Sequence, residues 1–245
     1  QDGGTNIVAG TGLEKRGRTC YNNVENRFKR VIRIKRGTVS KTREEKMVSV
    51  RKILQALYYI QQNAPAANPS NRTYMYLLKI LYFADRYHLR RFGFLASGDR
   101  YCAMKLGPVA SATYDILRKR FPRDANSAEI SLLDDVVDAD VYSVEIKPQE
   151  RDELSESFIE SLDFSIKEFG GYTQFELSDM THDFPEWSRF KTKLNAGEKK
   201  EYAVRLGDFF GNPEKTEQMD RYGKKNPYTE DAEFLDAMKA GLNGD

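Results

Sequence analysis

The residues best suited to chemistry lie close together in the first half of the chain. Asp85, Arg86 and His88 fall within four positions, and a turn separates them from a second charged pair, Asp99 and Arg100. A histidine acts as a general base only when a nucleophile or a metal is within reach, and the sequence offers no such partner for His88. We therefore expect His88 to have a structural role near the end of a helix, where an imidazole interacts favourably with the terminal carbonyl groups.

Two interpretations of the neighbouring charges are open. In the first, Asp85 and Arg86 form a buried polar network with Asp99 and Arg100, because buried charges need partners of opposite sign. In the second, Asp85 and Asp99 face solvent and receive a basic partner surface. Tyrosine and arginine are enriched among the residues that dominate binding energies. The candidates for partner contact are therefore Asp85, Arg86, Asp99, Tyr101, Tyr114 and Arg118.

The second histidine, His182, has Asp183 beside it and Asp179 three residues earlier. Adjacent side chains on a helix do not face each other, so we expect pairing at a helix end and not a catalytic His–Asp pair. Two cysteines and two histidines do not provide the paired spacing of a zinc site, and no phosphate-binding glycine loop is present. The sequence predicts neither a cofactor nor an enzyme.

Charge is distributed unevenly along the 245 residues. Hydrophobic residues make up 40% and charged residues 31%, which is typical of a globular chain long enough to bury a core. Residues 1–46 carry 12 Lys/Arg and 5 Asp/Glu, whereas residues 47–245 carry 27 Lys/Arg and 32 Asp/Glu. The acidic body argues against binding of a phosphate backbone by the main domain and is compatible with a basic partner protein. The longest apolar run is too short to span a bilayer, and no charged-then-apolar leader opens the chain, so we expect a cytoplasmic protein.

Helical periodicity organises the middle of the chain. Residues 74–93 carry apolar side chains on more than one face, which predicts a central buried helix. The spacing also predicts helices over 48–62, 149–169 and 174–181, the last with a capping box from Thr173 and Glu176.

Short strands are expected at 100–104 and 141–146, paired with each other in a small sheet. Gly107-Pro108-Val109 predicts a helix start, because proline at the first helical position presets the backbone. Residues 123–140 are predicted to be an acidic loop. The expected fold class is α+β, predominantly α-helical: a compact helical domain around a central buried helix with a small antiparallel β-sheet.

Three segments are expected. Residues 1–46, with the basic stretch from Arg27 to Arg36, are predicted to be a poorly ordered N-terminal extension; the chain begins with Gln1, and Met47 opens the domain proper. Residues 47–190 form the main domain, and residues 191–245 form a charged, helical C-terminal extension.

Four pieces of the sequence, in order, resemble the Panacea domain. They are the Leu81-Tyr82-Phe83-Ala84 helix, the turn from Gly93 to Asp99, Gly107-Pro108-Val109 with Tyr114, and the Glu176–His182 segment followed by Trp187. The resemblance covers roughly residues 50–190 and includes SocA-like and phage-associated GepA-like proteins.

The resemblance implies a cytoplasmic bacterial or phage antitoxin that neutralises a cognate toxin by binding it directly. Under this resemblance, the six candidates for partner contact become candidates for binding the toxin. Two alternatives remain: a proteolytic adaptor, whose C-terminal tail contacts a protease, and a nucleic-acid-binding regulator that uses the basic N-terminal arm. No membrane partner is expected.

Overall fold

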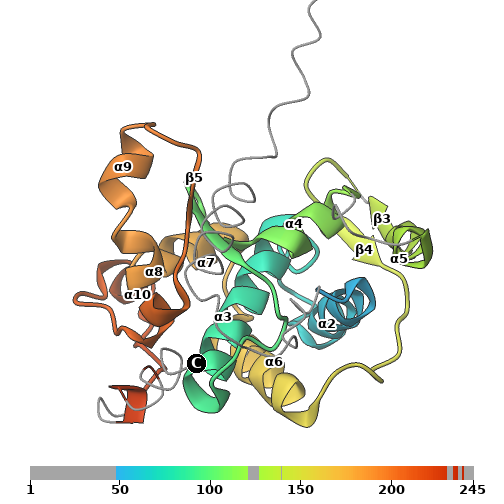
Figure 1. Cartoon of the computed structure of the whole chain (residues 1–245), viewed down its shortest axis with the longest axis horizontal. Coiled ribbons are helices and arrows are strands. Elements are labelled where there is room, and N and C mark those ends of the chain that lie inside the picture. The colour runs from blue at the N-terminus through green and yellow to red at the C-terminus, as the bar shows by residue number, and fades with distance from the viewer. Residues whose placement is uncertain (1–47, 121–126, 139, 231–233, 237–238, 240–245) are drawn as a thin grey trace, which may run out of the picture. The chain divides into compact units, whose positions relative to one another are not determined.

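The computed structural model describes residues 48–120, 127–138, 140–230, 234–236 and 239 (Figure 1). The predicted basic extension, residues 1–46, lies outside the described residues, as do several residues near the end of the predicted C-terminal extension. Helices predominate in the described part and a small antiparallel sheet accompanies them, which confirms the predicted α+β class.

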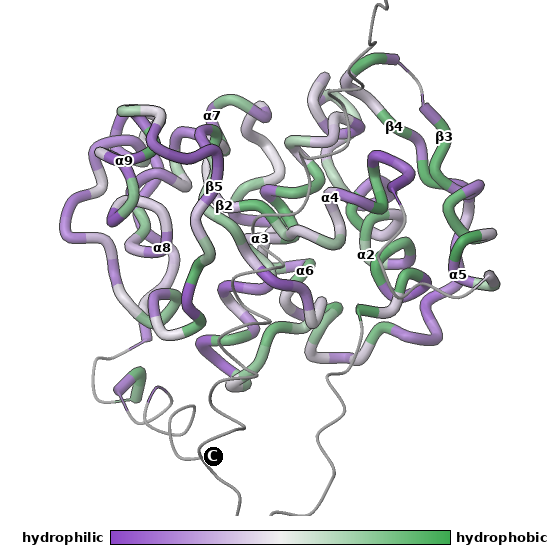
Figure 2. Tube along the Cα trace, turned by 45° about the horizontal axis from the view of Figure 1, so that its top comes forward, coloured by the Kyte–Doolittle hydropathy of each residue, from purple (hydrophilic) through white to green (hydrophobic). Residues whose placement is uncertain are grey.

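The central helix α3 (Tyr74–Phe92) organises the described residues. The Thr73 hydroxyl caps its start by accepting from the Tyr76 amide, and Gly93 ends it in the left-handed conformation with φ of 86°. Helix α3 is buried almost all round because α2 (Val50–Asn63), α6 (Glu156–Phe169) and α7 (Gln174–Thr181) pack against it. Figure 2 shows hydrophobic residues, in green, interspersed with hydrophilic ones along the elements that surround it. The predicted capping box of α7 is present.

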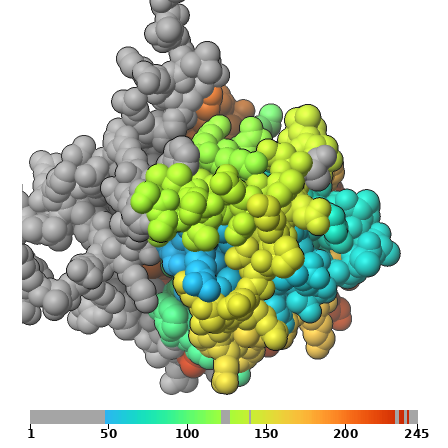
Figure 3. Space-filling view, turned by 90° about the vertical axis from the view of Figure 1, so that its right-hand side faces the viewer, coloured from blue at the N-terminus to red at the C-terminus, as the bar shows by residue number. Residues whose placement is uncertain are grey.

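Shorter elements complete the helical part. They are α4 (Ser111–Leu117), α5 (Ser127–Leu132), α8 (Pro185–Ser188), α9 (Lys191–Asn195), α10 (Glu217–Arg221) and the 3₁₀ helices η1 (Leu133–Asp135) and η2 (Leu206–Phe210). On the face shown in Figure 3, the blue surface of α2 lies among green-to-yellow segments, in keeping with its contacts to α5, β4 and α6.

The main sheet corrects one sequence prediction. Its antiparallel strands are β2 (Gly107–Ala110), β1 (Tyr101–Met104) and β5 (Glu201–Ala203), in that order. The prediction of a helix start at Gly107-Pro108-Val109 is wrong, because these residues form the edge strand β2 and the helix begins only at Ser111. Gly107 has φ of +101°, which suits a tight hairpin turn, and proline is tolerated on an edge strand.

The acidic stretch before residue 146 also differs from the prediction. The expected loop 123–140 contains α5, η1 and the strand β3 (Val136–Asp138). Strand β4 (Val144–Ile146) pairs with β3 and not, as predicted, with the strand at Tyr101. The alternation of apolar and polar residues over 141–146 correctly predicted a strand, but alternation does not specify the partner of a strand.

Residues 191–230 belong to the same core as the preceding elements. Strand β5 extends the sheet beside β1, and Phe209, Met219 and Tyr228 are buried in the main hydrophobic cluster. The predicted boundary at residue 190 therefore does not separate a C-terminal extension from the domain.

Candidate functional site: a buried polar helix and the surface around it

Asp85 holds the turn that follows α3. Its carboxylate is fully buried and accepts hydrogen bonds from the Ser97 amide (2.9 Å), the Ser97 hydroxyl and the Tyr101 hydroxyl (2.7 Å). Burial raises the pKa of Asp85 to about 6, although these hydrogen bonds act in the opposite direction. The residue links the central helix to strand β1 through neutral donors.

Asp99 takes the place of a missing helix cap. The residue before α4, Ala110, has no side chain that can cap it. Asp99 instead accepts from the Ala112 amide (3.0 Å), the Thr113 amide (2.7 Å) and the Thr113 hydroxyl (2.8 Å). Burial raises the pKa of this carboxyl as well, against the hydrogen bonds from Ala112 and Thr113.

Arg86 points to a different part of the chain. Its guanidinium donates to Glu186 (2.5 Å) and to the carbonyl of Gly211 (2.6 Å), and it lies 4.3 Å from the centroid of the Phe184 ring. The same oxygen of Glu186 accepts from the Tyr82 hydroxyl, whose pKa burial raises well above its usual value. The Arg86–Glu186 pair is completely buried.

The predicted network of Asp85 and Arg86 with Asp99 and Arg100 is wrong, because the side chains that bond to Asp85, Arg86 and Asp99 all lie outside this set. Asp85 and Arg86 are both buried, but each has partners of its own, and Arg100 is exposed. The alternative in which Asp85 and Asp99 face solvent is wrong, since 0% and 4% of their surface is exposed.

Helix α3 carries two further buried cations, Lys79 and Arg90, which were not predicted from the sequence. The Lys79 ammonium donates to the carbonyl of Pro108 (2.8 Å), and burial lowers its pKa to about 7. Arg90 donates to the Phe209 carbonyl, to Asn212 and to Glu230. Helical spacing was the available signal, because Lys79, Arg86 and Arg90 recur at intervals of seven and four residues.

The histidines are structural in the described part of the chain. His88 contacts the Phe94 carbonyl (2.7 Å) and the Ser157 hydroxyl (3.0 Å) through its two ring nitrogens, and burial lowers its pKa. His182 stacks on Trp187 at 3.6 Å between ring centroids, and burial lowers its pKa to about 4. The suggested pairing of His182 with an aspartate is replaced by this ring stacking.

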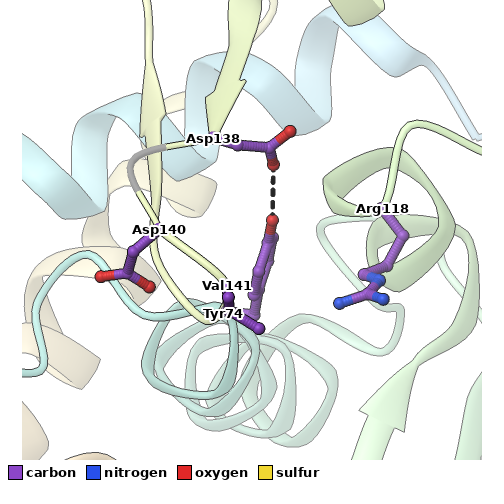
Figure 4. Close-up of a pocket in the computed structure, with 5 residues that line it drawn as sticks. All are labelled: Tyr74, Arg118, Asp138, Asp140 and Val141. Carbon is purple, nitrogen blue, oxygen red and sulfur yellow. Dashed lines mark hydrogen bonds between the residues drawn. The ribbon is translucent and has the colours of Figure 1, made fainter.

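A surface pocket of about 440 Å³ lies where α3, α4 and the β3–β4 turn meet (Figure 4). The Tyr74 hydroxyl donates to Asp138 (2.7 Å), and the Arg118 guanidinium lies 5.6 Å from the centroid of the Tyr74 ring. Lys119 also pairs with Asp138 at 3.4 Å. Asp140 and Val141 complete the lining, and Asp140 accepts hydrogen bonds from the Tyr142 and Ser143 amides.

The six predicted contact residues divide into two groups. Asp85, Arg86, Asp99 and Tyr101 are buried, whereas Tyr114 is half-buried and Arg118 is exposed. Within the described ranges, no group of three or more His, Cys, Asp or Glu side chains could hold a metal ion. No helix in that part combines the length and apolar character needed to cross a membrane.

These features define a class of protein: an α+β domain built on a buried polar helix, whose ionisable interior residues support its own fold. Residues 77–188, from α3 to α8, match the family described as antitoxin SocA-like, Panacea domain. This part of the chain is similar to a Panacea domain, and the match supports an antitoxin role with a toxin as the general kind of partner. No curated protein and no solved structure matches the chain.

Proposed function

We propose that this protein is an antitoxin that neutralises a cognate toxin by direct protein–protein binding in the cytoplasm. The match of residues 77–188 to the SocA-like Panacea family carries the proposal. The mechanism is stoichiometric occlusion of the toxin's working surface, with no cofactor. The interior supports this mechanism, because Asp85, Asp99 and Arg86 are engaged in hydrogen bonds that hold the fold together.

Two kinds of residue contribute to binding in this proposal. Tyr114 and Arg118 contact the toxin, since they reach the surface and belong to residue types enriched at interfaces. Asp85, Arg86, Asp99 and Tyr101 act indirectly, by fixing the elements that carry the surface residues.

Co-expression with the product of the neighbouring gene tests the proposal. Expression of that product alone should arrest growth, and the full chain should restore growth and co-purify with it. Growth arrest that persists although both proteins accumulate, together with no co-purification, would contradict direct neutralisation.

Truncation of the C-terminal segment cannot test the proteolytic-adaptor alternative. Removing residues 191–245 would delete strand β5 and buried residues such as Phe209 and Tyr228, so the domain itself would be damaged. The half-life of the toxin, measured with and without the intact chain, separates the two mechanisms. Occlusion leaves that half-life unchanged, whereas an adaptor shortens it.

A further inference from the structure

The turn of the β1–β2 hairpin is held unusually firmly. Three buried side chains bind alternate carbonyl groups along it: Trp187 donates to Met104 (2.7 Å), Ser178 to Leu106 (2.9 Å) and Lys79 to Pro108 (2.8 Å). These donors come from α8, α7 and α3, so three helices fix one turn. A side chain at Gly107 would collide with Thr181 and Lys79, so only glycine allows the backbone to lie this close to α7 and α3.

This fixed turn presents an apolar side chain to solvent. Leu106 is 52% exposed. Phe175, which is 63% exposed, lies one helical turn before Ser178 on the same face of α7, and Ser178 is bonded to the Leu106 carbonyl. Two large exposed hydrophobic residues therefore lie on neighbouring elements, the hairpin turn and α7, which the Ser178 hydrogen bond joins.

Lysines surround the turn. The register that pairs Met104 with Glu201 sets Lys105 opposite Lys200 just beyond the paired residues. Helix α9 lies against the same sheet, because its Leu194 packs with Ala103 and Trp187. The exposed lysines of this region are Lys105, Lys191, Lys193, Lys199 and Lys200.

None of these five lysines forms an ion pair with a carboxylate of the described residues. Glu198 and Glu201 are the carboxylates interspersed among them in sequence, which leaves a local net charge of +3. This local charge is opposite in sign to the acidic body, where 32 Asp/Glu exceed 27 Lys/Arg over residues 47–245.

We propose that this sheet-tip surface (Lys105, Leu106, Phe175, Lys191, Lys193, Lys199 and Lys200) binds an acidic surface of a protein partner. The inference rests on the proposed function and identifies the partner as the toxin. An apolar centre with a polar, solvent-accessible rim is the usual anatomy of a protein interface, and here lysines form the rim. Unpaired lysines at the rim attract a complementary negative surface and accelerate association.

A nucleic acid fits this surface less well. Phe175 is the one aromatic ring of the surface and offers a single stacking position, since Leu106 is aliphatic. The five cations of the surface are all lysines, whereas arginine provides the bidentate fork that matches a phosphate. An extended polyanion would also pass from the lysines onto the acidic remainder of the domain, where it would be repelled.

The test measures binding kinetics between the purified full-length chain and the purified product of the neighbouring gene. Lys105→Glu with Lys200→Glu should weaken the complex by about tenfold or more, mainly through slower association, and should reduce the dependence of affinity on salt. Lys225→Glu is the matched control, because Lys225 is also exposed and lies beyond α10, outside the sheet-tip surface; it should change the affinity less than about twofold.

Two further variants separate the contribution of charge from that of the apolar centre. Lys105→Gln with Lys200→Gln removes charge without reversing it and should produce a smaller loss in the same direction. Leu106→Ala with Phe175→Ala removes the apolar centre without changing any charge and should weaken binding without the change in salt dependence. Thermal unfolding of each variant, compared with the unsubstituted protein, verifies that the domain is intact.

The outcomes separate this inference from the antitoxin proposal. If the unsubstituted chain does not bind the product at all, both fail. If it binds and folded sheet-tip variants bind equally well, the sheet-tip inference alone is overturned. If those variants instead lose binding to a DNA duplex or RNA strand while toxin binding is unchanged, the surface is a nucleic-acid site and the inference is also wrong.

Discussion

The central helix α3 carries two sets of buried charges that are satisfied in different ways. Asp85 binds the turn before β1, within the residues that match the Panacea family, through amide and hydroxyl donors. Arg86 pairs with Glu186 inside that match and also donates to the Gly211 carbonyl beyond it. Arg90 donates to the Phe209 carbonyl and to Glu230, both of which lie beyond the match. One helix therefore organises both the family domain and the segment that follows it.

The difference shows which part of the fold depends on ion pairing. A carboxylate with several neutral donors needs no nearby cation, so the turn around Asp85 is self-contained. A buried arginine without its carboxylate is an uncompensated charge, so the C-terminal segment and α8 depend on their pairs. Substitution of Asp85 and substitution of Arg86 should consequently change the free energy of unfolding by different amounts and with different pH dependence.

The largest effect on stability is expected from substitution of Arg86. Arg86→Met leaves Glu186 buried with only the Tyr82 hydroxyl, and the free energy of unfolding should fall by about 3–5 kcal/mol. Urea denaturation measures this change. Adding Glu186→Gln should recover part of the loss, because the orphaned charge is then removed; a double variant that is less stable than Arg86→Met would contradict the explanation.

A smaller effect is expected at the carboxylate that caps α4. Asp99→Ala removes the acceptor for two amides and one hydroxyl, which should cost about 2 kcal/mol of stability. Asp99→Asn retains one oxygen acceptor and should cost less. Equal losses in the two variants would show that Asp99 acts by its charge and not by capping.

The pH dependence of Asp85 tests the carboxylate side further. Its folded pKa of about 6 exceeds the ordinary value of 3.8, so between these values the folded protein holds a proton that the unfolded chain has released. The stability contribution of Asp85 is present below about pH 4 and is lost as the pH rises through 6. Relative to Asp85→Asn, the unsubstituted protein should therefore become more stable, by up to about 3 kcal/mol, from pH 7 to pH 4. A difference between the two proteins that does not vary over this range would show that the carboxyl is not perturbed by burial.

The smallest effect on stability is expected at the surface. Arg118 is exposed and borders the pocket beside Tyr74, so Arg118→Ala should change stability by less than about 0.5 kcal/mol. The affinity of the Arg118→Ala variant for the toxin should nevertheless fall below that of the unsubstituted protein. Circular dichroism melts and a binding titration give the two quantities, and unchanged affinity would remove Arg118 from the contact surface.

The sequence predicted the central helix well, because its apolar residues recur at helical spacing, but it left the burial of Asp85 as one of two open interpretations. It did not predict the strand at Gly107-Pro108-Val109, since proline suits a helix start and an edge strand equally well and tertiary contacts from Lys79 and Thr181 decide between them. The partners of Arg86 and Arg90 were also not predictable, as they lie 100 or more residues away along the chain.

Calorimetric titration of the intact chain into the purified product of the neighbouring gene tests direct neutralisation most simply, with the toxin's activity followed in the same samples. We expect a saturable complex and a loss of toxin activity that parallels its formation. Full toxin activity in the presence of excess, folded antitoxin would contradict neutralisation by binding.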